Sequence, residues 1–136
     1  MPKTEGEFRV NINQQLAGRI SQQALQKGIR AATIEAERLV IDDLSKPGKG
    51  EVRRDGSRAS APGDPPAADT GRLRQSVSSE VTTTATEVVG KVSANAEYAA
   101  HLEIGTESIA PRPFMSRLLT VHLDRVLNAF RFGAKI

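Results

Sequence analysis

The residues of this sequence that could carry out acid–base or metal chemistry are few and lie far apart. His101 and His122 are its two histidines, and they fall on separate predicted elements without a carboxylate at the spacing of metal ligands. Glu103 is two residues from His101, and residues two apart on a helix do not share a face. The sequence has no nucleophile elbow, no Gly-rich phosphate loop and no paired-carboxylate pattern. It therefore predicts no catalytic residues, no cofactor and no metal, and the protein is not expected to be an enzyme.

The size and composition indicate one small domain, residues 1–136, with a thin core. Of the 136 residues, 38% are apolar, and there is no Cys, which excludes disulfides and thiolate metal sites. No apolar run reaches the roughly 20 residues needed to cross a bilayer, and no signal peptide is recognisable at the N-terminus. We expect a protein made in the cytoplasm that does not enter a membrane and that gains burial from partner subunits.

The first long element is predicted to be a helix over Asn11–Leu44, which lacks Pro and is rich in Ala, Leu, Gln, Glu and Arg. Its apolar residues change face close to Gly28. Either the helix bends at Gly28, or it is continuous and packs against different surfaces along its length. A partner subunit would explain the second surface.

The segment that follows, 46–69, is rich in Gly, Pro, Ser and charge, and is predicted to be a long flexible loop that becomes ordered on assembly. It holds a basic cluster whose net charge, +3, equals that of the whole chain. This cluster is either a solvated surface or a contact to an anionic partner, and we expect an acidic protein surface rather than DNA. Its cations are Lys46, Lys49, Arg53, Arg54 and Arg58.

The middle of the chain changes to a β pattern. Thr70 is a plausible N-cap for a short helix over Gly71–Ser76, which places Leu73 on an apolar side. β-branched residues then predict two antiparallel strands, Ser78–Thr84 and Glu87–Ala94, joined by a tight turn. Because a two-stranded hairpin alone is marginal in water, it must pack on a helix, join a larger sheet or pair with another subunit.

Two further helices are predicted near the C-terminus. The first, over Ala96–Ile104, would carry Tyr98 inward, together with Leu102 and Ile104, and end at Gly105. The second begins with Pro113 at its first position and runs to about residue 130.

The last helix is expected to be apolar on two sides, more than one small core can cover. Phe114, Leu118 and Val121 form one stripe, and the second is the candidate subunit interface. Tyr98 and Phe114 are the expected anchors between the helices and the sheet. The candidate interface consists of Leu119, Leu123, Val126 and Phe130. The fold class is thus α+β, with a long N-terminal helix, a small antiparallel sheet, short helices and a C-terminal helix.

Three short motifs follow one another between residues 70 and 119: a Thr-Gly-x-Leu-Arg-x-Ser segment, a Tyr before Glu-x-Gly-Thr, and Arg-Pro-Phe at the start of the last helix. Their order resembles that in the neck and tail-completion proteins of long-tailed phages, the minor tail protein Z-like group. The chain departs from the group at Ile104, where an aromatic residue is usual. The matching residues are Thr70, Gly71, Leu73, Arg74, Ser76, Tyr98, Glu103, Gly105, Thr106, Arg112, Pro113 and Phe114.

The resemblance implies a non-enzymatic α+β subunit that assembles as a ring, expected to be a hexamer, at the head–tail junction of the virion. Its implied partners are the adjoining head-completion or connector protein and the tail-tube or tail-terminator protein, around a channel for DNA. Two other functions remain open: a tail terminator that caps the tube, and a small DNA-associated protein that uses the basic segment 46–58 without sequence specificity.

Overall fold

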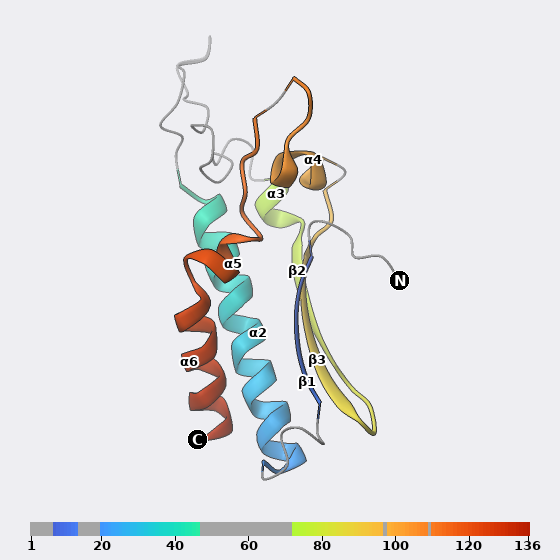
Figure 1. The fold of residues 1–136 in the computed structure, drawn as a ribbon, viewed down its shortest axis with the longest axis vertical. Coiled ribbons are helices and arrows are strands. Elements are labelled where there is room, and N and C mark those ends of the chain that lie inside the picture. Colours follow the sequence, from blue (N-terminus) through green and yellow to red (C-terminus); the bar gives the residue numbers. More distant parts are fainter. Residues whose placement is uncertain (1–6, 14–19, 47–71, 97, 109) are drawn as a thin grey trace.

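The computed structural model describes residues 7–13, 20–46, 72–96, 98–108 and 110–136. Within them, one long helix lies between a three-stranded sheet on one side and the C-terminal helix on the other, and shorter helices cluster at one end (Figure 1). The fold is therefore mixed α+β, with the long helix, the short helices and the C-terminal helix that the sequence predicts. Ring formation is a question of assembly, and the fold of one chain does not address it.

The first element is a strand, β1 (Glu7–Asn13), and the helix predicted from Asn11 begins only at Gln22. The prediction of helix at its N-terminal end was therefore wrong. The segment Phe8-Arg9-Val10-Asn11-Ile12-Asn13 alternates apolar and polar residues, as a strand requires. Its pairing with β3 (Glu87–Ala94), from Glu7↔Ser93 to Asn13↔Glu87, outweighs the helical propensity of its neighbours.

The long helix α2 (Gln22–Leu44) is continuous through Gly28. It starts at Ser21, whose hydroxyl accepts a hydrogen bond of 3.1 Å from the Ala24 amide, as an N-cap does. Of the two alternatives for the change of apolar face, the continuous helix is confirmed. One face packs on the sheet and the other on the C-terminal helix of the same chain, so a partner subunit is not needed to cover the second face.

The predicted hairpin is confirmed as β2 (Val77–Thr83) and β3, and β1 completes an antiparallel sheet in the order β1-β3-β2. The sheet lies against α2 because Gly90 allows a close approach: a Cβ on Gly90 would stand 1.9 Å from the Thr33 hydroxyl oxygen. The inner residues Val88 and Val92 of β3 are buried there. The larger sheet and the helix together supply the support that a hairpin needs.

Two short helices, α3 (Arg72–Gln75) and α4 (Ala99–Ile104), lie at the end of the sheet nearest the C-terminal end of α2. Leu73 is buried in the main core, as predicted. Gly105 ends α4 with a φ of 78°, a conformation that a Cβ would disfavour, which confirms its role as a terminator.

The predicted last helix is two helices. Pro113 lies before them, α5 (Arg117–Thr120) is a single turn, and α6 (Leu123–Ala134) follows after a break at residues 121–122. The expectation of one helix starting at Pro113 was therefore wrong. The break follows from side-chain contacts that hold α5 against the end of α2, described below.

Candidate functional site

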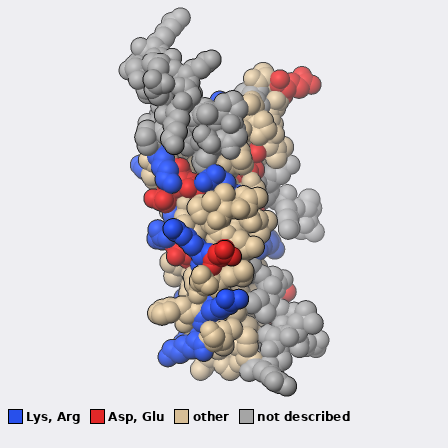
Figure 2. All heavy atoms as spheres, turned by 60° about the vertical axis from the view of Figure 1, so that its left-hand side comes forward, with Lys and Arg blue, Asp and Glu red and all other residues tan. Residues whose placement is uncertain are grey.

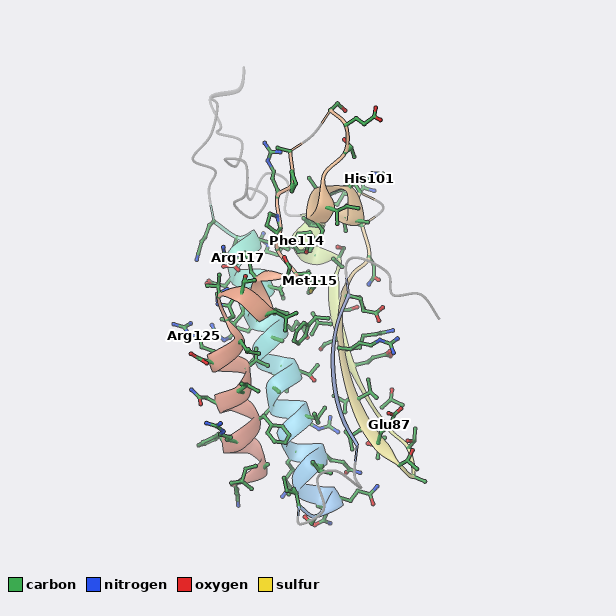
Figure 3. All side chains as sticks on the ribbon, viewed as in Figure 1. Glu87, His101, Phe114, Met115, Arg117 and Arg125 are labelled. Carbon is green, nitrogen blue, oxygen red and sulfur yellow. The ribbon has the colours of Figure 1, made fainter. Side chains whose placement is uncertain are left out.

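Glu103 positions the start of the C-terminal segment. Its carboxylate accepts hydrogen bonds from the backbone amides of Phe114 (3.4 Å), Met115 (2.7 Å) and Ser116 (3.2 Å), and from the Ser116 hydroxyl (2.9 Å). These amides precede α5 and have no partner within the helix, so a carboxylate is suited to them. Phe114 and Met115 are buried in consequence, and Figure 3 shows them inside the upper part of the molecule.

Glu103 therefore links α4 to the segment that leads into α5, through its contacts with residues 114–116. The backbone amide of Arg112 donates a hydrogen bond to the carbonyl of Leu102 at 2.7 Å. Both ends of the loop between α4 and α5 are therefore anchored.

A buried carboxylate, Asp43, fixes the break between α5 and α6. Its Oδ2 accepts hydrogen bonds from Arg117 Nε at 3.0 Å and His122 Nε2 at 2.8 Å, and Lys46 Nζ lies 3.6 Å from Oδ1. Burial raises the pKa of Asp43, but the hydrogen bonds from His122 and Arg117 and their charges outweigh it, so the pKa lies below its ordinary value. Asp43 stands in the last turn of α2, where the helix dipole disfavours an anion, and the surrounding cations offset this. His122 accordingly has a structural contact.

α6 packs against α2 at a point where two glycines meet. A Cβ on Gly133 would stand 2.7 Å from the Ala31 Cβ and from the Lys27 carbonyl oxygen, and one on Gly28 would stand 2.7 Å from the Phe130 ring. Side chains of any size would separate the two helices here. The face of α6 turned to α2 therefore belongs to the core of this chain.

This packing covers two of the four residues of the candidate subunit interface and leaves the other two exposed. Val126 is 3% exposed and Phe130 is partly buried against both apolar cores, so both serve the fold of this chain. Leu119 and Leu123 remain exposed, at 58% and 38%. Assigning Val126 and Phe130 to a subunit interface was wrong, because α6 turns them toward α2.

The exposed aliphatic residues near the α5–α6 break form what we call the junction patch. It comprises four large side chains within nine residues, each between 38% and 58% exposed. Val121 was expected to form one stripe with Phe114 and Leu118, but those two are buried and Val121 is exposed, because the helix breaks at this residue. The members of the junction patch are Leu119, Val121, Leu123 and Leu127.

A second surface lies where α2 and α6 run side by side, and we call it the helical groove. It is an open hollow of about 560 Å³. Phe132, on its wall, is 87% exposed, the largest exposed fraction among the exposed large apolar residues of the described chain. Figure 3 shows Arg125 on the outer side of α6. The groove is lined by Glu35, Arg38, Arg125, Asn128, Ala129 and Phe132.

The solvent side of α2 next to the groove is basic. Lys27, Arg30 and Arg38 are exposed and share one side of the helix, with exposed Ile34 between them. Glu35 pairs with Arg38, while Glu37 bonds to Ser79 on the sheet side. Figure 2 brings forward the side of the molecule where α6 lies, and there Lys and Arg groups are scattered, together with fewer Asp and Glu groups, over a surface of other residues.

The residues of the motifs between residues 70 and 114 have different environments. Tyr98, expected as a core anchor, is 37% exposed, and the Arg72 guanidinium lies 6.0 Å from its ring centre. Ile104 is exposed as well, so the inward placement predicted for both residues was wrong; Ala99 takes the buried position of α4. Phe114 is fully buried, as expected.

Several predicted residues fall outside the described ranges. These are Thr70 and Gly71 of the motif, and Lys49, Arg53, Arg54 and Arg58 of the basic cluster, with the loop that carries them. Lys46 is described, and it pairs with Asp42 and Asp43. Thr106 accepts a hydrogen bond of 3.3 Å from the Ser108 amide within the loop after α4.

In the part of the chain that the structure describes, no group of three or more His, Asp or Glu side chains is placed to hold a metal ion. None of the described helices is long and apolar enough to span a membrane. Comparisons with protein-family models, with curated proteins and with solved structures find no match to this chain.

The sequence indicates the basic side of α2 only in part, and it does not indicate the buried Asp43. The spacing of Lys27, Arg30 and Arg38 places three cations on one side of a helix, but the sequence does not say which side faces solvent. Asp43 precedes its partners Arg117 and His122 by more than 70 residues, and nothing local marks it as buried.

Proposed function

We propose that this protein is a structural, ring-forming subunit of a phage virion that acts at the head–tail junction. There it completes the tail or joins it to the capsid around the DNA channel. The order of motifs from residue 70 to Phe114 supports the phage assignment. The structure adds physical roles for several of them: Glu103 and Gly105 shape the turn into the C-terminal segment, and Phe114 anchors it.

The observation that carries the ring is the placement of two unpartnered surfaces on α6. At about 100° per residue, Phe132 projects roughly 140° from Leu127 and roughly 180° from Leu123. The junction patch and the helical groove therefore occupy nearly opposite flanks of one helix. A two-fold dimer uses one self-complementary surface, whereas a closed ring uses two different surfaces on each copy.

The test is the assembly state of the purified full-length protein, by native mass spectrometry and electron microscopy. We expect closed rings, and Leu123→Asp should prevent them while leaving the circular dichroism spectrum of the fold unchanged. The control is Gln23→Asp, which adds the same charge at an exposed position in the first turn of α2, where an anion is tolerated. A wild-type protein that remains a monomer, or that stops at a two-fold dimer, would overturn the proposal.

The place of the ring is tested separately, in particles. Antibody labelling of this protein should mark the junction between head and tail. Label at the far end of the tail, or an absence of label on virions, would contradict the placement. Protein recovered bound to DNA as a monomer or dimer would favour the small DNA-associated class instead.

A further inference from the structure

The charged residues of α2 and α6 are unevenly distributed along the two helices. The acidic side chains of both helices lie in the half nearer the α5–α6 break: Glu35, Glu37, Asp42 and Asp43 on α2, and Asp124 on α6. The other half is formed by residues 22–34 of α2 and by residues 127–136, and it contains no Asp or Glu. Four exposed cations lie in this half, which we call the cationic end: Lys27, Arg30, Arg131 and Lys135.

The packing of the two helices brings these cations to one end of the molecule. α2 and α6 run in opposite directions (Figure 1), and a Cβ on Gly133 would stand 2.7 Å from the Lys27 carbonyl oxygen. The last turn of α6 therefore lies beside the second turn of α2. At about 100° per residue, Lys27 and Arg30 lie about 60° apart on α2, and Arg131 and Lys135 about 40° apart around α6. Each helix thus contributes one pair of exposed cations.

The cationic end is not neutralised by the acidic residues of the chain. Glu35 pairs with Arg38, and Asp42 and Asp43 pair with Lys46, all in the other half of the helices. Within the described ranges, no ion pair joins any of the four cations to a carboxylate.

Other anions near this end of the molecule offset little of its charge. Glu87 lies at the tip of the hairpin, on the opposite side of α2 from α6 (Figure 3). The terminal carboxylate after Ile136 offsets one of the four positive charges. In Figure 2 the lowest charged groups on the face brought forward are Lys and Arg. The cationic end therefore has a surplus of positive charge that an anionic partner would neutralise.

We propose that the cationic end binds the phosphate backbone of duplex DNA without sequence specificity. Cations that are spread over the outside of two helices suit a partner whose negative charges repeat at short intervals, and duplex DNA carries one about every 1.7 Å of its axis. Lys27 and Arg30 are about 4.5 Å apart along α2, and Arg131 and Lys135 are about 6 Å apart along the axis of α6. These spacings correspond to one or two phosphates of one strand, at about 3.4 Å each along the axis.

The side chains of the cationic end favour a duplex over a single strand. Proteins that bind single strands stack successive bases on several aromatic side chains. Among the described residues of the cationic end, Phe132 is the one exposed aromatic side chain. The inference stands on the charges of one chain and does not require the proposed ring. In a ring around DNA, it identifies the part of each subunit that is turned to the channel.

The experiment measures the affinity of the full-length protein for a short fluorescent DNA duplex, by fluorescence anisotropy at increasing salt. Each neutralised phosphate contributes about 0.9 to the slope of log affinity against log salt, so the dissociation constant should rise roughly 100-fold between about 50 and 200 mM salt. Lys27→Gln with Arg30→Gln should lower this slope by about 2. The matched control, Arg9→Gln with Lys91→Gln, removes two cations that face each other across β1 and β3 and should leave the slope nearly unchanged.

The other outcomes of this assay overturn the inference. If the wild type does not bind the duplex at low salt, or if both double variants lower the slope equally, the cationic end is an ordinary solvated surface. If binding survives Gln at all four cations but not Ser at Lys49, Arg53, Arg54 and Arg58, the contact is the basic segment 46–58. Tighter binding to single-stranded DNA would exclude the duplex as the partner, and tighter binding to polyglutamate would assign the surface to an acidic protein.

The same measurements separate this inference from the proposed function. A protein that binds the duplex through the cationic end but stays a monomer keeps the inference and removes the ring. A protein that forms rings whose binding is unaffected by Gln at all four cations keeps the ring and removes the inference.

Discussion

The two sides of α2 are covered to very different degrees. On the sheet side, Gly90 brings β3 to within contact of Thr33, and Val88 and Val92 are fully enclosed. On the other side, glycines bring α6 just as close, but α6 keeps leucines and a phenylalanine in water. The apolar residues of the sheet side are covered within one chain. The apolar residues of α6 are covered only in part, and this difference supports the proposed assembly through α6.

Substitutions on the covered and uncovered sides of α6 should differ most in their effect on the free energy of unfolding at two neighbouring residues, Val126 and Leu127. Val126→Asp places an unpaired charge in the core and should lower the free energy of unfolding by more than about 4 kcal/mol. Leu127→Asp changes an exposed side chain and should alter it by about 0.5 kcal/mol or less. Urea unfolding of both in the Leu123→Asp background would exclude any contribution from assembly. Equal losses in the two variants would mean that α6 has no outward face.

Removing the polar contact of Asp43 at the end of α2 should have the second largest effect on the free energy of unfolding. Asp43→Asn leaves Arg117 and His122 without their carboxylate and should lower the free energy of unfolding by about 2–3 kcal/mol near neutral pH. Because the pKa of Asp43 is lowered in the folded state, its contribution is complete above the unfolded pKa near 4 and is lost as the pH falls through the folded pKa. The difference between wild type and variant should therefore be constant from pH 5 to 7 and shrink below about pH 4. A difference that grows toward low pH would show that Asp43 is not held as an anion.

The third test concerns the close approach of β3 to α2 at Gly90 and Thr33. Gly90→Ala would press its Cβ on the Thr33 hydroxyl and should lower the free energy of unfolding by about 1–3 kcal/mol. Thr33→Ala removes that oxygen and also its hydrogen bond to the Ile29 carbonyl, at a cost of about 1 kcal/mol. The double variant should be more stable than the sum of the two losses predicts, as measured by a double-mutant cycle. Strict additivity would indicate that the sheet moves away from α2 instead.

Several elements of this protein can be recognised from short stretches of its sequence, without knowledge of tertiary contacts. The β-branched run from residue 77 to 94 is a hairpin because β-branched side chains suit a pleated, half-buried surface, so the run is recognisable in the sequence. The body of α2 follows from strong helix formers without Pro, and Gly105 ends α4 because few other residues accept a positive φ. Phe114 was predictable as a buried anchor from its size and its place after the Arg-Pro motif.

Only the tertiary structure decided the remaining features, because each depends on a partner far along the chain. The alternating segment at residues 8–13 becomes a strand since β3, 74 to 84 residues further along the chain, offers it a free edge. The last helix breaks because Asp43 holds both Arg117 of α5 and His122 within the break. The same distant packing decides which apolar residues of α6 are covered: Val126 turns to α2, whereas Leu123 and Phe132 stay exposed. Periodicity reports that a helix has apolar sides, but the neighbour that covers a side is set by the rest of the fold.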